Sequence, residues 1–95
     1  MHAVVGGVML KPGRADEALS MIAKGGVAML QGMAGSAGGY WLRNLDGDDI
    51  QHSFWLFATE DDARAAEETF NRLREMPDAP ATLVSVDVCE VVGQA

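Results

Sequence analysis

The chain has 95 residues, of which 48% are hydrophobic, 7 are Lys or Arg and 14 are Asp or Glu, so its formal net charge is −7. This length predicts a single domain over residues 1–95. The acidic balance repels phosphate backbones and therefore argues against nucleic-acid binding. The single cysteine, Cys89, excludes an internal disulfide and a cysteine-based metal cluster, and it favours a reducing, cytoplasmic setting.

The first predicted element is a strand over residues 3–11, which is apolar on both faces. This pattern is typical of a strand that is covered on both sides. The stretch is short and interrupted by two glycines, so it predicts neither a signal peptide nor a membrane span.

A helix is predicted after Pro12-Gly13, with Asp16 and Glu17 in its first turn, where acidic side chains favour the helix dipole. Apolar residues spaced three or four apart predict its buried stripe: Leu19, Ile22, Gly26, Met29 and Met33. Gly25-Gly26 lies inside the helix, and each glycine costs up to about 1 kcal/mol relative to alanine. We expect either close packing against the backbone there or a bend.

A glycine-rich connection is predicted over residues 32–39, followed by a hairpin. Its strands are predicted over residues 40–45 and 50–59, joined by an Asp-Gly turn over residues 46–49. Alternation divides the second strand into two faces. One face carries Ile50, His52, Phe54, Leu56 and Ala58, and the other carries Gln51, Ser53, Trp55, Phe57 and Thr59.

Thr59 predicts the N-cap of a second helix that extends to about residue 76. Its inner stripe is predicted to be Ala63, Ala66, Phe70 and Leu73, with the pairs Glu60–Arg64 and Glu68–Arg72 outside. A last strand is predicted over residues 81–92, where valines alternate with other residues.

Two helices cover one face of a four-stranded sheet, yet the second face is apolar as well. Trp55 and Phe57 lie opposite Phe54 and Leu56, so no chain remains to cover one of these two sets. Two sheets packed face to face across a two-fold axis solve this problem. The sequence therefore predicts a homodimer, and we assign Trp55 and Phe57 to its interface.

The element order and the segments KPGRADEAL, GGYWLR, FWLFATEDDARAA and SVDVCEVV resemble the dimeric α+β barrel superfamily, and within it the antibiotic-biosynthesis-monooxygenase-type proteins. The resemblance implies an α+β fold, a ferredoxin-like βαββαβ subunit with a four-stranded antiparallel sheet. It also implies a dimeric barrel and a cleft between each sheet and its own helices. Characterised members oxidise aromatic polyketide quinols without a cofactor, or degrade haem.

The haem-degrading members use an asparagine on strand one, a tryptophan on strand three and a histidine on the second helix. Alignment of the strand ends places these roles on Gly7, Ala58 and Glu67, and none of the three matches. Glu67 is a poor substitute for a histidine axial ligand. We therefore expect no haem, no other cofactor and no metal site.

Four residues are candidates for a site that binds a small aromatic ligand. His52 is the candidate catalytic base, because it shares a face with Ala58, which the resemblance turns toward the cleft. Trp41 and Phe54 are candidate walls, and Arg43 is a candidate partner for a phenolate or carboxylate. Each has a structural alternative: His52 as a strand-end residue, the aromatic residues as core, and Arg43 as a charge that protects an edge strand.

Two functions remain open at this point. The first is a cofactor-independent monooxygenase that acts on an aromatic or quinol-type metabolite in the sheet–helix cleft. The second is a non-catalytic homodimer of the same fold that binds a small ligand or has a structural role. The sequence contains no nucleotide-binding, zinc-protease or nucleophile-elbow motif that would indicate another class.

Overall fold

The structure is a computed structural model, and it describes residues 1–47 and 49–95. The elements follow one another in the order strand, helical segment, two strands, helical segment, strand. Their bounds are β1 His2–Leu10, α1 Ala15–Met21, η1 Ile22–Gly26, α2 Val27–Gln31, β2 Ser36–Arg43, β3 Ile50–Phe57, α3 Glu60–Asn71, η2 Arg72–Glu75 and β4 Ala81–Glu90. The predicted turn over residues 46–49 includes Asp48, which lies outside the described residues.

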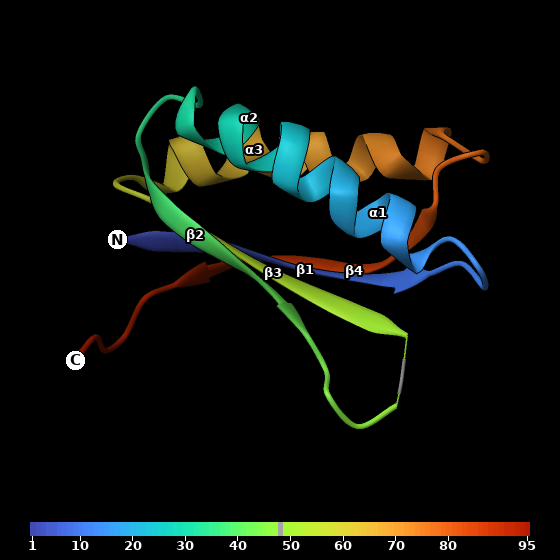
Figure 1. The fold of residues 1–95 in the computed structure, drawn as a ribbon. Helices are drawn as coiled ribbons and strands as arrows, with labels where there is room; N and C mark the ends of the chain where they lie inside the picture. The colour runs from blue at the N-terminus through green and yellow to red at the C-terminus, as the bar shows by residue number, and fades with distance from the viewer. Residues whose placement is uncertain (48) are drawn as a thin grey trace.

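The four strands form one antiparallel sheet in the order β2-β3-β1-β4. Both helical segments pack on the same face of this sheet, as Figure 1 shows. This order and the single helical layer are those of a ferredoxin-like α+β fold, as the sequence predicts. We call the sheet face under the helices the covered face, and the opposite one the open face.

The first helical segment contains a π-helical turn, η1, between α1 and α2. This turn includes the two adjacent glycines. A Cβ on Gly26 would lie 3.7 Å from ring atom Cζ2 of Trp41, whereas a Cβ on Gly25 would meet nothing within 4 Å. A Cβ at Gly26 would therefore make only an ordinary van der Waals contact, so close packing requires neither glycine. The segment departs from regular α-helical geometry here, in a π turn of a kind that occurs often at functional sites.

β2 begins at Ser36, inside the connection predicted over residues 32–39. The strand starts early because Gly39 lets its backbone approach both neighbours. A Cβ on Gly39 would lie 2.7 Å from Leu30 Cδ2 and 2.7 Å from the Phe54 carbonyl oxygen. A glycine cluster that reads as a loop is therefore partly a strand held between α2 and β3.

The second helical segment follows its sequence prediction closely. The Thr59 hydroxyl accepts a hydrogen bond from the Asp62 backbone N–H at 3.2 Å, which caps α3. Arg64 Nε lies 3.2 Å from Glu60 Oε2, so this predicted pair is confirmed. Glu68 and Arg72 form no ion pair among the described residues, because α3 gives way to the 3₁₀ helix η2 at Arg72.

The alternation predicted for β3 is confirmed, but the assignment of its two faces was wrong. Trp55 and Phe57 are 4% and 0% exposed and belong to the core under the helices. They cannot form a sheet-to-sheet interface. His52 and Phe54 lie on the open face, with His52 opposite Gly7 and Phe54 opposite Val5. The error arose because both faces of β3 are apolar, so periodicity identifies the residues of each face but not which face the helices cover.

Candidate functional site

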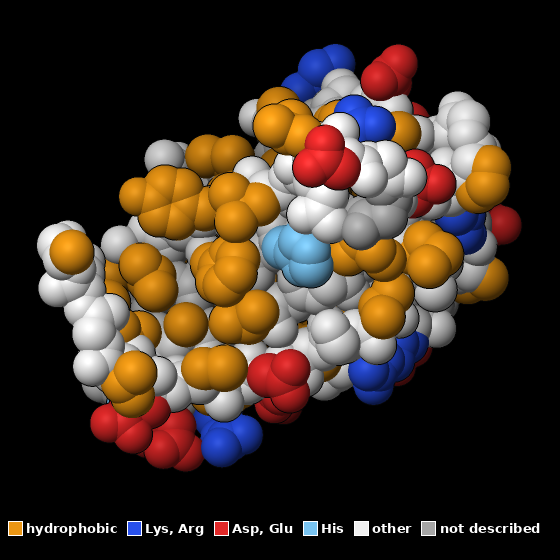
Figure 2. All heavy atoms as spheres, turned by 90° about the horizontal axis from the view of Figure 1, so that it is seen from below, with side chains coloured by type: hydrophobic (Ala, Val, Ile, Leu, Met, Phe, Trp, Pro, Cys, Tyr) orange, Lys and Arg blue, Asp and Glu red, His pale blue; other side chains and the backbone are white. Residues whose placement is uncertain are grey.

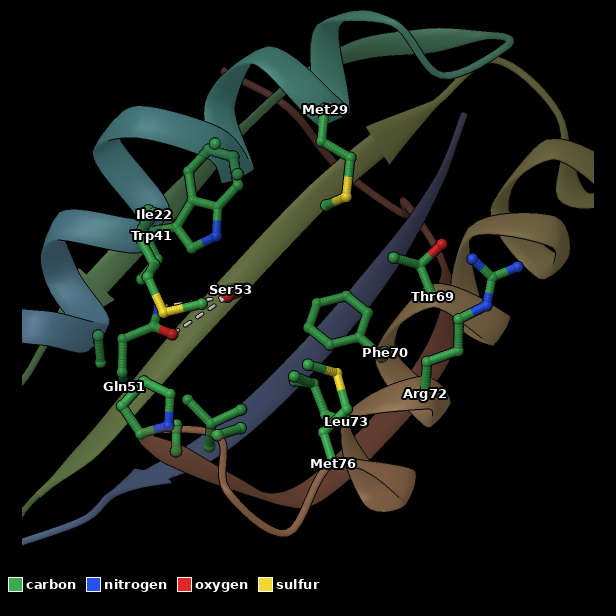
Figure 3. Close-up of a pocket in the computed structure, with 18 of the residues that line it drawn as sticks. Ile22, Met29, Trp41, Gln51, Ser53, Thr69, Phe70, Arg72, Leu73 and Met76 are labelled. Carbon is green, nitrogen blue, oxygen red and sulfur yellow. Dashed lines mark hydrogen bonds between the residues drawn. The ribbon is translucent and has the colours of Figure 1, made fainter.

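The covered face of the sheet forms the floor of a cleft of about 520 Å³ between the two helical segments. Figure 3 shows the cleft, with side chains reaching it from both helical segments and from the strands. Ile22 and Met29 line it from the first helical segment, and Phe70, Leu73 and Met76 line it from the second. The cleft that the resemblance implies between the sheet and its own helices is thus present.

Three aromatic side chains form a cluster in this cleft. The ring centroids of Trp55 and Phe70 are 4.1 Å apart with an interplanar angle of 33°. Those of Trp41 and Trp55 are 6.1 Å apart at 61°, an edge-to-face arrangement. Phe70 comes this close because Gly6 lies beneath its ring, where a Cβ would overlap the ring atoms. The cluster offers flat, apolar surfaces to an aromatic ligand.

Two neutral polar side chains lie on the floor of the cleft. Gln51 and Ser53 are 2% and 3% exposed, and both line the cavity. Gln51 Nε2 donates a hydrogen bond to Ser53 Oγ at 3.2 Å and another to the backbone carbonyl of His52. The Ser53 hydroxyl lies 3.4 Å from Gln51 Oε1, to which it can donate. The pair is therefore buried with its hydrogen-bonding groups largely engaged by one another.

The indole N–H of Trp55 is different, because its Nε1 is buried and has no hydrogen-bond partner among the described residues. A buried donor without a partner costs about 1–3 kcal/mol. Trp55 also lines the cleft. Because Nε1 is covered by neighbouring protein atoms, an acceptor on a bound molecule would satisfy this donor once those side chains shift aside.

The end of the cleft near Ala79 and Pro80 is held by side chains that precede and begin α1. Arg14 Nη1 donates to the Asp78 carbonyl at 2.8 Å, and the Lys11 N–H donates to the Pro80 carbonyl at 2.9 Å. Arg14 also makes two hydrogen bonds to the Glu17 carboxylate, at 2.8 and 2.9 Å. These bonds, reinforced by the charge of Arg14, hold the pKa of Glu17 below its ordinary value.

The predicted site residues separate in the structure. Trp41 lines the cleft, as predicted. Arg43, on β2, is paired with Gln51 on β3. Its side chain is exposed, and it is not among the residues that line the cleft. His52 and Phe54 lie on the other side of the sheet, so neither reaches the cleft that they were predicted to serve. Trp55, assigned to an interface, is instead a central part of the cleft.

Sequence reasoning missed Gln51, Ser53 and Phe70 as site residues. A signal for the first two is visible on β3, where polar side chains precede two aromatic ones on the same face (Gln51, Ser53, Trp55 and Phe57). When polar residues begin a strand face that is otherwise aromatic, that face is polar at one end, and a cleft built on it has a partly polar floor. Phe70 carries no such signal, because its stripe on α3 is that of an ordinary core helix.

The open face has a different character. Figure 2 shows hydrophobic side chains spread across this side of the molecule, with a histidine among them. Its apolar residues include Tyr40 and Leu42, which are 66% and 46% exposed. Val5, Phe54 and Leu56 are on the same face by strand register, and so is His52. None of these residues lines the cleft.

The residues of the cleft do not fit a haem group. Gly7 is on the open face, Ala58 follows the end of β3, and neither they nor Glu67 line the cleft. Among the described lining residues there is no His, Cys or Tyr, the usual axial ligands besides methionine. Nor do the described His, Cys, Asp and Glu side chains form a group of three or more that could hold a metal ion. We therefore derive no chemistry from haem.

Within the described part of the chain, none of the helices has the length and hydropathy that a bilayer span requires.

No family model matches the sequence, and no curated protein matches it as a relative. Solved structures match over nearly the whole chain. HapK from Hahella chejuensis has 14% identity and a TM-score of 0.75, covering 100% of this chain and 96% of that chain.

The heme-degrader MhuD from Mycobacterium tuberculosis, with two hemes bound in its active site, has 17% identity and a TM-score of 0.74, covering 100% of this chain and 99% of that chain. SnoaB from Streptomyces nogalater, a cofactor-independent oxygenase, has 17% identity and a TM-score of 0.72, covering 98% of this chain and 95% of that chain. At these identities the likeness concerns the fold alone. The fold is that of the antibiotic-biosynthesis-monooxygenase-like α+β proteins, as the sequence resemblance implies.

Proposed function

We propose that this chain binds a flat, hydroxylated aromatic metabolite in its sheet–helix cleft and supports oxygenation of that metabolite without a bound cofactor. One observation carries the proposal: an apolar cleft with aromatic walls contains a buried indole N–H, on Trp55, that has no partner among the described residues. Its volume, about 520 Å³, falls in the range of small-molecule sites. The fold shared with a cofactor-independent oxygenase supports the reaction class.

The reaction would convert a phenol-type ring to a quinone. The ring carbon opposite the hydroxyl exchanges its hydrogen for one oxygen atom of O₂, and the hydroxyl becomes a carbonyl. The second oxygen atom leaves as water with the two hydrogens lost from the substrate. The substrate supplies all four electrons, so the step needs no further reductant.

The protein would contribute orientation and electrostatic stabilisation. Trp41 and Phe70 would hold the ring in the cleft. Negative charge develops on the ligand hydroxyl oxygen as its proton leaves, and the Trp55 N–H would donate to that oxygen. Gln51 lies on the same strand face, four residues earlier, and would form part of the floor under the ligand, because its two amide N–H groups are engaged by Ser53 and the His52 carbonyl. A fixed donor aimed at developing charge is an effective catalytic device in a site with little water.

The test uses anthrone, which supplies the hydroxyl as its enol tautomer 9-anthrol, and 1-naphthol, with anthracene and naphthalene as analogues that lack oxygen. We expect the hydroxylated compounds to quench tryptophan fluorescence, and anthrone to consume O₂ and gain one labelled oxygen from ¹⁸O₂. Trp55→Phe replaces the indole with a smaller aromatic ring that lacks the N–H, so affinity should fall by at least about three- to tenfold, the value of one hydrogen bond. Trp41→Phe makes the same chemical change at the other cleft tryptophan and should have a smaller effect. Binding of neither hydroxylated compound would refute the proposal.

A second function, binding without turnover, is favoured by one feature of the cleft. Arg72 is the only charged side chain among its described lining residues, and no His, Asp or Glu is among them to accept a proton. A ligand that loses its proton only slowly to solvent would then be bound but not oxidised. Binding of anthrone with no O₂ uptake above the rate in buffer would establish this second function in place of the first.

We also propose that the open face mediates a homodimer, with Phe54, Leu56 and Leu42 replacing Trp55 and Phe57 as interface residues. The support is the apolar character of this face, which includes side chains as exposed as Tyr40 at 66%. Exposed apolar patches of this kind mark interaction sites. Sedimentation velocity should show a dimer of the 10.1 kDa chain at micromolar concentration. Phe54→Asp should yield monomers, whereas the exposed-helix control Lys24→Asp should not.

A further inference from the structure

A second, smaller cavity of about 320 Å³ lies beside the cleft. It is lined by residues from the end of β1, from η2 and the turn after it, and from the start of β4. Leu73, Met76 and Ala81 line both this side cavity and the main cleft. The two cavities are thus separated by little more than these side chains. In Figure 3, Leu73 and Met76 lie at the edge of the cleft where the η2 segment borders it.

The charged residues that line the two cavities are all cations. Arg72 lines the main cleft, and Lys11 and Arg74 line the side cavity. No Asp or Glu among the described residues lines either one. Yet the chain has 14 acidic residues against 7 basic ones. Cavities lined by one sign of charge attract ligands of the opposite sign, and this lining reverses the sign of the molecule as a whole.

The two arginines are available to a ligand. Neither Arg72 nor Arg74 makes a hydrogen bond or an ion pair with the described residues, although Glu68 lies one helical turn before Arg72. Lys11 is partly engaged, since its Nζ donates to the Pro77 carbonyl at 2.5 Å. A guanidinium without a partner matches a planar carboxylate, to which it can donate two parallel hydrogen bonds.

We infer that the ligand is an aromatic carboxylate, with its ring system in the main cleft and its carboxylate turned toward a cationic end formed by Arg72 on the cleft and by Arg74 and Lys11 on the adjoining side cavity. This inference rests on the proposed function, because it assigns a second chemical group to the ligand of the same cleft. The Trp55 N–H and the cationic end then recognise two different parts of one molecule. A neutral aromatic compound would use only the first.

The test compares 6-hydroxy-2-naphthoate with 2-naphthol, which share the ring and hydroxyl and differ in the carboxylate. Affinities are measured by tryptophan fluorescence and calorimetry at about 20 and 200 mM salt. We expect the carboxylate to bind about tenfold more tightly at low salt, with the advantage falling at high salt because solvent-exposed charges are screened. If 2-naphthol binds and the carboxylate gives no advantage, the inference is wrong and the proposed function stands. If neither compound binds, both are wrong.

Single substitutions test which cations contribute to binding of the carboxylate. Arg72→Gln and Arg74→Gln should each weaken 6-hydroxy-2-naphthoate binding about three- to fivefold and change 2-naphthol binding less than twofold, the range for a partly exposed ion pair. Lys24→Gln removes the same charge from an exposed position outside both cavities, so it should leave both affinities unchanged. Equal losses in all three variants would show that only net charge matters and would overturn the assignment. Thermal melting of each variant checks that it remains folded.

Discussion

The polarity of the two sheet faces is the reverse of the usual arrangement, because the covered face buries polar side chains and the open face exposes apolar ones. The covered face buries two polar side chains, Gln51 and Ser53, which are 2% and 3% exposed. The open face displays Tyr40 and Leu42, which are 66% and 46% exposed. In a domain that works alone, apolar groups are buried and polar groups face water. These two departures are the basis for the proposals of a ligand on the covered face and of a protein interface on the open face.

The faces also differ in what fills them. The covered face packs Trp55 and Phe70 with their ring centroids 4.1 Å apart, over a glycine that makes room for them. The open face has apolar side chains without a second layer. Two strand faces of similar composition therefore have different energetic roles, and substitutions on either face should reveal the difference.

The largest effect is expected from the same substitution made on the two faces of β3. Phe57→Ala removes a fully buried ring and should lower the free energy of unfolding by about 3–5 kcal/mol. Phe54→Ala removes a ring that is only partly buried, so it should cost the protomer less than Phe57→Ala, about 1–2 kcal/mol, and weaken self-association. Urea unfolding measures the first quantity and sedimentation velocity the second. A loss at Phe54 as large as that at Phe57 would contradict the assignment of the two faces.

A second, smaller effect is expected at two adjacent glycines that face opposite sides. A Cβ on Gly6 would overlap the ring of Phe70, which is itself packed against Trp55 and has little room to move. Gly6→Ala should therefore cost about 1–3 kcal/mol by overpacking and alter the tryptophan fluorescence. Gly7→Ala, on the open face, would approach only the Ser85 hydroxyl at 3.1 Å.

Gly7→Ala is the control for Gly6→Ala, because it makes the same change at the adjacent glycine on the open face. Ser85 is exposed and can rotate away, and alanine has less freedom than glycine in the unfolded chain, so Gly7→Ala should change stability by less than about 1 kcal/mol. Chemical denaturation of both variants tests the prediction. If Gly6→Ala proved neutral, the ring of Phe70 would have to be mobile, and the cleft would have a softer wall than the structure shows.

The sequence predicts the elements well because their signals are local. β3 and the N-cap at Thr59 lie where alternation and capping chemistry place them. The stripe of the first helical segment is predicted less well. Ile22, Gly26 and Met29 face the cleft as expected, but the residues that are buried are Ala18 and Leu30 rather than their neighbours Leu19 and Met29. The π turn between them explains the shift, because an extra residue in one turn rotates the faces on either side of it.

The site is predicted less well than the fold, because it depends on which sheet face the helices cover. Trp41 lies in the cleft, where it was expected, and the cleft itself is present. His52 and Phe54 were placed on the wrong side, since a strand that is apolar on both faces carries no signal for the covered one. The aromatic pair Trp55–Phe70 joins residues from β3 and α3 through tertiary packing, which no local pattern encodes.

The smallest effect is expected at the cap of α3, the helix that carries one wall of the cleft. Thr59→Ala removes the acceptor for the Asp62 N–H and should cost about 1 kcal/mol. Thr59→Ser keeps an acceptor hydroxyl and should remain near wild type. Because α3 covers only one face, Thr59→Ala should also weaken ligand binding in the cleft slightly while leaving self-association through the open face unchanged. Equal losses of binding and self-association would show that the two faces are coupled through the sheet, and their separation as independent surfaces would then be wrong.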